Sequence, residues 1–129
     1  MLTQYLYRRM LQMKHFNGSP VCKIFGMHHT GDVHQQGCVI SFVLHRYTGE
    51  EVGYSEVEKL ASLVSIHLRT GCFCNPGECH ESLQLSSADI KDHITMGHVC
   101  WDDNYLIKGK STGAVRISLG YMSNVADCN

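Results

Sequence analysis

The sequence has no long apolar run and no excess of charge of one sign. No apolar stretch approaches the roughly 20 residues that span a bilayer, so no membrane segment is expected. Eleven Lys and Arg residues are balanced by twelve Asp and Glu residues, and no basic cluster exceeds the pair Arg8 and Arg9. We therefore expect neither nucleic acid nor membranes as partners. Because Arg8, Arg9 and Lys14 interrupt the N-terminal segment, it does not resemble a secretion signal, and we expect a cytoplasmic location.

Prolines and repeats are also scarce. The chain contains two prolines and no repeat or low-complexity tract. Its 129 residues suffice for one compact domain but not for two ordinary ones. Apolar residues make up 43% of the chain, which is enough to build a core and excludes a disordered protein.

Cysteine and histidine, by contrast, are abundant. Seven cysteines, an odd number, and nine histidines occur in a chain without a recognisable secretion signal. Because reducing compartments keep thiols reduced, this combination favours free thiols, a metal site or catalysis over a disulfide framework. His28, His29 and His34 share a predicted loop, but their spacing is not diagnostic and we assign them no role.

Apolar spacing in the first half predicts a helix, two strands and a second helix. Residues 2–15 have the spacing of an amphipathic helix, and residues 21–25 and 38–44 have the composition of strands. Residues 55–58 (SEVE) match a capping box that would open a second helix. The apolar positions of that helix are expected to face the core: Val57, Leu60, Ala61 and Val64.

The second half predicts a loop, a helix and a strand. Residues 70–79 read as a shaped loop, because two glycines flank a proline. A capping signal at residues 86–89 opens a helix that ends at Gly97. Residues 114–120 alternate, so that Arg116 and Ser118 face away from the aliphatic side chains. The order of elements predicts an α+β fold with helices on one face of a mostly antiparallel sheet.

The cysteine-rich loop carries the first chemical candidates. A thiol with a pKa of roughly 8.5 needs a cationic or dipolar neighbour to become a nucleophile, and Arg69 lies close enough in sequence to approach Cys74. The alternative is that these cysteines only pack against the helices. A zinc site is the other alternative, although the ligand spacing is poor and we expect no metal. Its ligands would be Cys72, Cys74, Cys79 and His80, with His98 and Cys100 as further candidates.

Arg116 is the second candidate. An arginine in the middle of a strand, on the face opposite the aliphatic residues, can bind a carboxylate through both arms of its guanidinium group. The alternative is a surface arginine paired with a neighbouring Asp or Glu.

Several motifs resemble the molybdenum cofactor sulfurase family. The main ones are residues 69–77 (RTGCFCNPG), 97–100 (GHVC) and 112–123 (TGAVRISLGYMS). Residues 17–21 (NGSPV) and 53–57 (GYSEV) are also similar, and the resemblance covers roughly residues 5–123.

The resemblance implies a fold and an activity. The fold would be the small C-terminal subdomain of a pyridoxal phosphate-dependent class V aminotransferase fold, with residues 1–16 as a connecting helix and residues 17–129 as a subdomain truncated at its C-terminus. Such enzymes take sulfur from L-cysteine as a protein persulfide and pass it to the molybdenum cofactor, which activates xanthine dehydrogenase and aldehyde oxidase. A homodimer is implied for the full-length enzyme.

The resemblance also implies roles for single residues. Cys74 matches the persulfide-forming cysteine, Arg116 matches the arginine that holds the substrate carboxylate, and Arg69 matches an arginine near the same substrate. No lysine of the chain has a Schiff-base context, so the residues that bind pyridoxal phosphate are expected in a missing large domain and the isolated chain is expected to be inactive. The roles of Cys72, Cys79 and Cys100 stay open. A zinc-stabilised interaction module and a cysteine desulfurase with another sulfur acceptor are the alternative functions.

Overall fold

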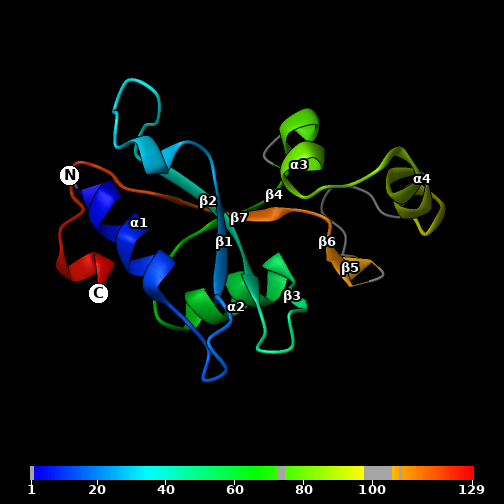
Figure 1. Cartoon of the computed structure of the whole chain (residues 1–129), viewed down its shortest axis with the longest axis horizontal. Helices are drawn as coiled ribbons and strands as arrows, with labels where there is room; N and C mark the ends of the chain where they lie inside the picture. The colour runs from blue at the N-terminus through cyan, green and yellow to red at the C-terminus, as the bar shows by residue number, and fades with distance from the viewer. Residues whose placement is uncertain (1, 73–74, 98–105, 108) are drawn as a thin grey trace.

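A computed structural model of the chain describes residues 2–72, 75–97, 106–107 and 109–129. The helices within these residues are α1 (Leu2–Gln12), α2 (Tyr54–Leu63), α3 (Pro76–Ser82) and α4 (Ser87–Thr95), with short 3-10 turns at η1 (His28–Thr30) and η2 (Ala126–Cys128). The strands are β1 (Cys22–Phe25), β2 (Val39–His45), β3 (Glu51–Val52), β4 (Arg69–Gly71), β5 (Leu106–Ile107), β6 (Lys110–Ser111) and β7 (Ala114–Ser118). The α+β class is confirmed (Figure 1).

The main sheet is antiparallel throughout. Its strand order is β1-β2-β7-β4, and β3 pairs with the end of β2, while β5 and β6 form a separate two-stranded sheet. Strands β2 and β7, the two with the clearest β pattern in the sequence, occupy the centre. The predicted antiparallel sheet is therefore confirmed.

Helices α1 and α2 cover one face of this sheet. Met10 of α1 packs there with buried side chains of β1, β2 and β7, among them Phe42 and Val115. Tyr54 and Val57 of α2 add partly buried contacts to the same cluster. Alternation along β7 thus directs Val115 into this core, as the sequence predicted.

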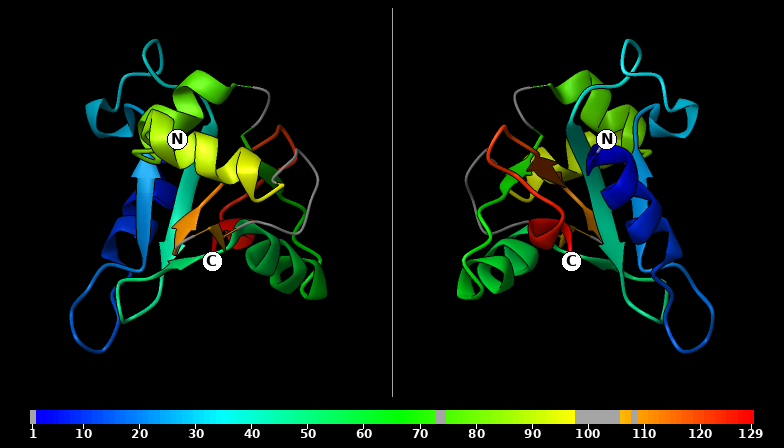
Figure 2. Two further views of the ribbon diagram at one scale, coloured as in Figure 1. Left: turned by 90° about the vertical axis from the view of Figure 1, so that its right-hand side faces the viewer. Right: turned by 90° about the vertical axis from the view of Figure 1, so that its left-hand side faces the viewer.

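Helix α3 packs on the opposite face, so the prediction of helices on one face is wrong. Cys79 and Leu83 form a second buried cluster with Val43 of β2 and Ala114 of β7, whose neighbours Phe42 and Val115 belong to the first cluster. Figures 1 and 2 show α2 and α3 on opposite sides of β7. Residues 70–79 were predicted as a loop, but Asn75 accepts a hydrogen bond from the Glu78 amide and Pro76 occupies the first helical turn, which is a helix start.

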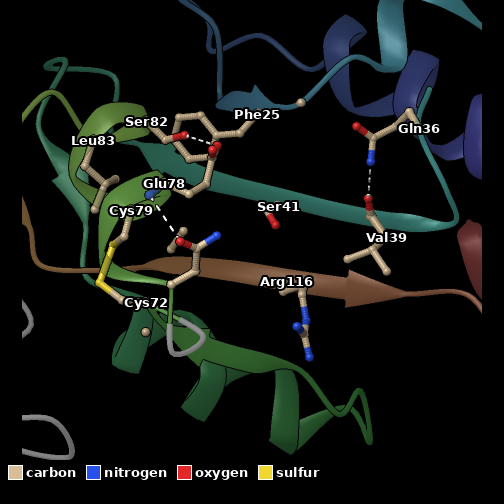
Figure 3. A pocket seen from close by; sticks show the side chains of 14 residues that line it. Phe25, Gln36, Val39, Ser41, Cys72, Glu78, Cys79, Ser82, Leu83 and Arg116 are labelled. Carbon is tan, nitrogen blue, oxygen red and sulfur yellow. Dashed lines mark hydrogen bonds between the residues drawn. A yellow bond between two sulfur atoms is a disulfide. The ribbon is translucent and has the colours of Figure 1, made fainter.

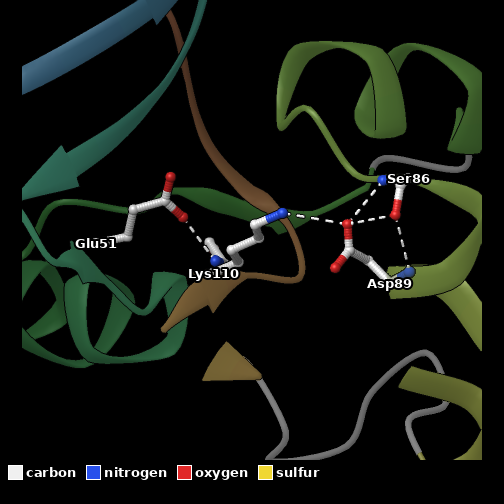
Figure 4. Close-up of polar contacts among 5 residues, drawn as sticks. Glu51, Ser86, Asp89 and Lys110 are labelled. Carbon is white, nitrogen blue, oxygen red and sulfur yellow. Dashed lines mark hydrogen bonds and ion pairs between the residues drawn. The ribbon is translucent and has the colours of Figure 1, made fainter. Parts of the chain in front are cut away.

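Helix α4 begins as predicted and α2 does not. The Ser86 and Asp89 side chains form the expected capping box, and Lys110 of β6 binds the Asp89 carboxylate at 3.1 Å (Figure 4). The hydrogen bonds from Ser86 and Lys110 hold the pKa of Asp89 well below its usual range. By contrast, α2 is preceded by Gly53 and has no side-chain cap, so the predicted capping box at residues 55–58 is wrong.

The predicted core stripe of α2 is also only partly correct. Val57 contacts the core, whereas Leu60 is 58% exposed and Val64 is 67% exposed. Helical spacing defines a common face but does not say that this chain covers all of it. Separately, no helix in the described part of the chain is long and apolar enough to cross a membrane.

Candidate functional site

A cavity of about 370 Å³ lies between the α3 face of the sheet and the segment that joins β1 to β2. Arg116 of β7, Ser41 of β2 and Phe25 of β1 line it from the sheet, and Cys72 and Cys79 line it near α3 (Figure 3). The cavity therefore brings together Arg116 and the cysteine-rich segment, two features that the sequence indicated separately.

The sheet places the arginines in one row. Arg116 is directly opposite Ser41 on one side and directly opposite Arg69 on the other. Directly opposite residues of antiparallel strands point to the same face, so both guanidinium groups belong to the cavity side of the sheet. Arg116 is half-buried and lines the cavity, whereas Arg69 is exposed at the edge strand and is not one of the lining residues. Of the two predicted arginines, Arg116 is thus the one positioned to bind a ligand there.

Cys72 and Cys79 form a disulfide, with Cα atoms 5.4 Å apart. This contradicts the expectation of free thiols, which rested on cellular compartment rather than on geometry. The chain turns back after β4, so that α3 returns the second cysteine to the first. Among the described cysteines, Cys22, Cys38 and Cys128 are free.

The predicted nucleophile, Cys74, lies outside the described residues, as do His98 and Cys100. Its described neighbours on either side, Cys72 and Asn75, both line the cavity. The Asn75 amide donates a hydrogen bond to the Cys72 carbonyl at 2.9 Å. The two ends of this short stretch are therefore fixed at the cavity wall.

The backbone of residues 111–113 packs closely against the end of β4, directly before Cys72. Ser111, Thr112 and Gly113 are buried, and the Thr112 carbonyl oxygen lies 3.2 Å from the Cys72 sulfur. A Cβ atom on Gly113 would lie 2.6 Å from the Gly71 Cα atom. Sequence reasoning missed this role of Gly113, although a glycine directly before a predicted strand was the available signal.

Gln36 shapes the opposite wall of the cavity. Its side-chain oxygen accepts a hydrogen bond from the Met27 amide at 2.9 Å, and its side-chain nitrogen donates to the Val39 carbonyl at 3.3 Å. These bonds tie the two ends of the segment between β1 and β2 together. Nothing in the sequence pattern singled out Gln36.

The described residues, those of the cavity included, contain no cluster of metal ligands. In residues 2–72, 75–97, 106–107 and 109–129, no group of three or more His, Cys, Asp or Glu residues could hold an ion. The zinc alternative required Cys72 and Cys79 as separate thiolate ligands, which the disulfide precludes in this state. His28 is buried against the Tyr7 ring, and burial lowers the pKa of its side chain.

The chain is similar to molybdenum cofactor sulfurases of plants and animals. Molybdenum cofactor sulfurases of Oryza sativa subsp. japonica, Arabidopsis thaliana and Homo sapiens are 53%, 47% and 44% identical to it over 127, 127 and 126 residues. These alignments cover 98% of this chain but only 15%, 16% and 14% of the three relatives. No family model and no solved structure matches the chain, so the class V aminotransferase fold stays a prediction.

Proposed function

The chain is a homologue of one segment of the molybdenum cofactor sulfurases, and on this premise we propose that it supplies the sulfur-accepting cysteine of such an enzyme. That cysteine is Cys74, which takes sulfur from L-cysteine as a persulfide. The sulfur then passes to the molybdenum cofactor, the step that activates xanthine dehydrogenase and aldehyde oxidase in the cytoplasm.

One observation carries this proposal. Arg116 and the two residues that flank the stretch with Cys74 line the same cavity. L-Cysteine has a carboxylate at one end and a thiol at the other, so an arginine can hold the carboxylate while an acceptor cysteine takes up the sulfur. The guanidinium group of Arg116 binds the carboxylate and leaves the substrate sulfur directed toward the cysteine-rich segment.

The described lining of the cavity lacks the lysine to which pyridoxal phosphate is attached in such enzymes. None of the described residues that line it is a lysine, so this wall offers no amine for covalent attachment of the cofactor. We therefore assign the pyridoxal phosphate of the proposed reaction to another part of the sulfurase. The contribution of this chain is to bind the substrate carboxylate and to accept the sulfur.

A chimera tests the role of Cys74. The matching segment of the rice sulfurase, 53% identical, is replaced by this chain, and the chimera is incubated with L-cysteine. Mass spectrometry should find one added sulfur atom on Cys74. The Cys74→Ser variant should lose this persulfide, and the control Cys38→Ser should keep it because Cys38 is an exposed free cysteine. A persulfide that persists in Cys74→Ser would refute the assignment.

The same chimera tests Arg116. Loss of a charged hydrogen bond costs about 1.5–3 kcal/mol, so Arg116→Gln should raise the KM for L-cysteine by about 10- to 150-fold. The matched control is Arg69→Gln, which should change KM less because Arg69 is exposed and does not line the cavity. An unchanged KM for L-cysteine in Arg116→Gln would remove Arg116 from its proposed role. Persulfide formation without activation of a molybdenum enzyme would instead favour a desulfurase with another acceptor.

A further inference from the structure

The geometry points to a thiol–disulfide exchange site in the cavity wall: we propose that Cys72 and Cys79 are a reversible redox pair that fastens α3 to the end of β4. The chemical class of its reaction partner is a dithiol. The exchange itself stands on the described residues alone, and its consequence for sulfur transfer rests on the function proposed above.

The pair occupies an accessible position. Both cysteines line the cavity, with Cys72 half-buried and Cys79 only 8% exposed. The described free cysteines do not line the cavity. Cys22 is buried and its thiol donates a hydrogen bond to the Met10 carbonyl, Cys38 directly precedes β2, and Cys128 is buried in η2. A reductant that enters the cavity therefore meets the Cys72 sulfur first.

Both redox states fit the same fold. After reduction, the Cys79 thiol stays among Val43, Leu83 and Ala114, where a thiol behaves as a small apolar group. The Cys72 thiol has the Thr112 carbonyl oxygen 3.2 Å away as a hydrogen-bond acceptor. Reduction thus leaves neither sulfur in an unfavourable environment, and reoxidation needs no repacking of the second cluster.

The dithiol supplies the two electrons and two protons that reduction of the Cys72–Cys79 disulfide requires. Its first thiolate attacks the Cys72 sulfur, the Cys72–Cys79 bond breaks, and Cys79 leaves as a thiolate that takes up a proton. The second thiolate of the reductant then attacks the mixed disulfide and releases Cys72, which is also protonated. Two electrons and two protons pass to the protein, and the dithiol becomes a cyclic disulfide.

The consequence concerns the segment that the pair closes. In the oxidised state, residues 72–79 form a covalent loop that includes position 74 and the start of α3. In the reduced state, the start of α3 is held by the Asn75 cap and the packing of Leu83. The redox state of the pair therefore sets whether residues 72 and 79, which lie on either side of position 74 in the sequence, are covalently joined.

The test is a redox titration of the full chain with mixtures of reduced and oxidised dithiothreitol. Denaturation with an alkylating reagent and cleavage after Glu78 separate Cys79 from the peptide that carries Cys72, and fragmentation distinguishes Cys72 from Cys74. We expect the Cys72–Cys79 link to convert to two alkylated thiols in one two-electron transition, and to return on reoxidation. Circular dichroism should stay unchanged across the transition.

Two variants make the result specific. Cys79→Ala should leave Cys72 open to alkylation without reductant, whereas Cys38→Ser should leave the transition in place. The proposal is overturned if Cys72 and Cys79 are alkylated in the oxidised chain, if either is linked to Cys74, or if reduction unfolds the chain. Because this readout involves no persulfide, its failure leaves the chimera experiment unaffected, and failure of that experiment leaves the exchange intact.

Discussion

Replacing Gly113 by alanine probes the contact on which the cavity wall is built. The new Cβ atom would lie 2.6 Å from the Gly71 Cα atom and 2.7 Å from the Gly71 carbonyl carbon. Ordinary contact begins at 3.4 Å, so the two backbone segments must separate by about 0.8 Å. Gly71 is paired with Ala114 in the sheet and cannot rotate away as a flexible side chain would.

The expected cost follows from this geometry. Overpacking of a close-packed region costs typically 1–3 kcal/mol, and a backbone-to-backbone clash belongs at the upper end, about 3 kcal/mol. The reduced entropy of the unfolded chain returns about 0.4–1 kcal/mol. The net loss of about 2–3 kcal/mol corresponds to a fall in Tm of about 8–12 °C for a domain of this size.

Thermal and urea unfolding of Gly113→Ala and of the control Gly120→Ala measure this loss. Gly120 lies just beyond β7, and a Cβ atom there would meet nothing within 4 Å. Gly120→Ala should therefore be neutral or slightly stabilising. If Gly113→Ala were as stable as Gly120→Ala, the close approach of the two segments would be refuted.

Three further predictions concern titration, thiol access and capping. Burial lowers the pKa of His28, so near the ordinary pKa of 6.5 the unfolded chain binds more protons at this residue than the folded chain does. The unfolding free energy should therefore fall as the pH drops through that value. His28→Phe should reduce this slope, and His29→Phe, on an exposed residue, should not. Under native conditions Cys38 should be alkylated much faster than Cys22, because Cys38 is exposed and burial raises the pKa of the Cys22 thiol, which equal rates would contradict. Ser86→Ala should cost about 1 kcal/mol in urea unfolding, because α4 loses its N-cap, and an unchanged midpoint would count against the capping box.

Strands β1, β2 and β7 were predictable because their signals are local, whereas the short strands β3, β4, β5 and β6 were not predicted. The alternation around Arg116 and the β-branched run of residues 38–44 reflect which side chains face a core, and the sheet keeps that pattern. The α4 cap was also predictable, since Ser86 and Asp89 bond within one turn.

The remaining features depend on distant parts of the chain. The start of α3 was missed because Asn75 and Pro76 suit a turn as well as a helix, and only the packing of Cys79 and Leu83 decides between them. The Cys72–Cys79 disulfide depends on how α3 folds back, which spacing alone does not specify. Leu60 has helical spacing but stays exposed, because spacing does not identify what covers a face.

The alternation in β7 also limits how the length of this segment can vary. Val115 points into the buried core, and the adjacent Arg116 points to the cavity. Inserting or deleting one residue between Gly113 and Arg116 would exchange the two environments, placing a guanidinium group in the apolar core and an aliphatic side chain at the cavity. A one-residue change in the exposed turn at residues 46–50 would alter neither environment. Gaps between sulfurase sequences are thus expected in that turn and not at residues 113–116.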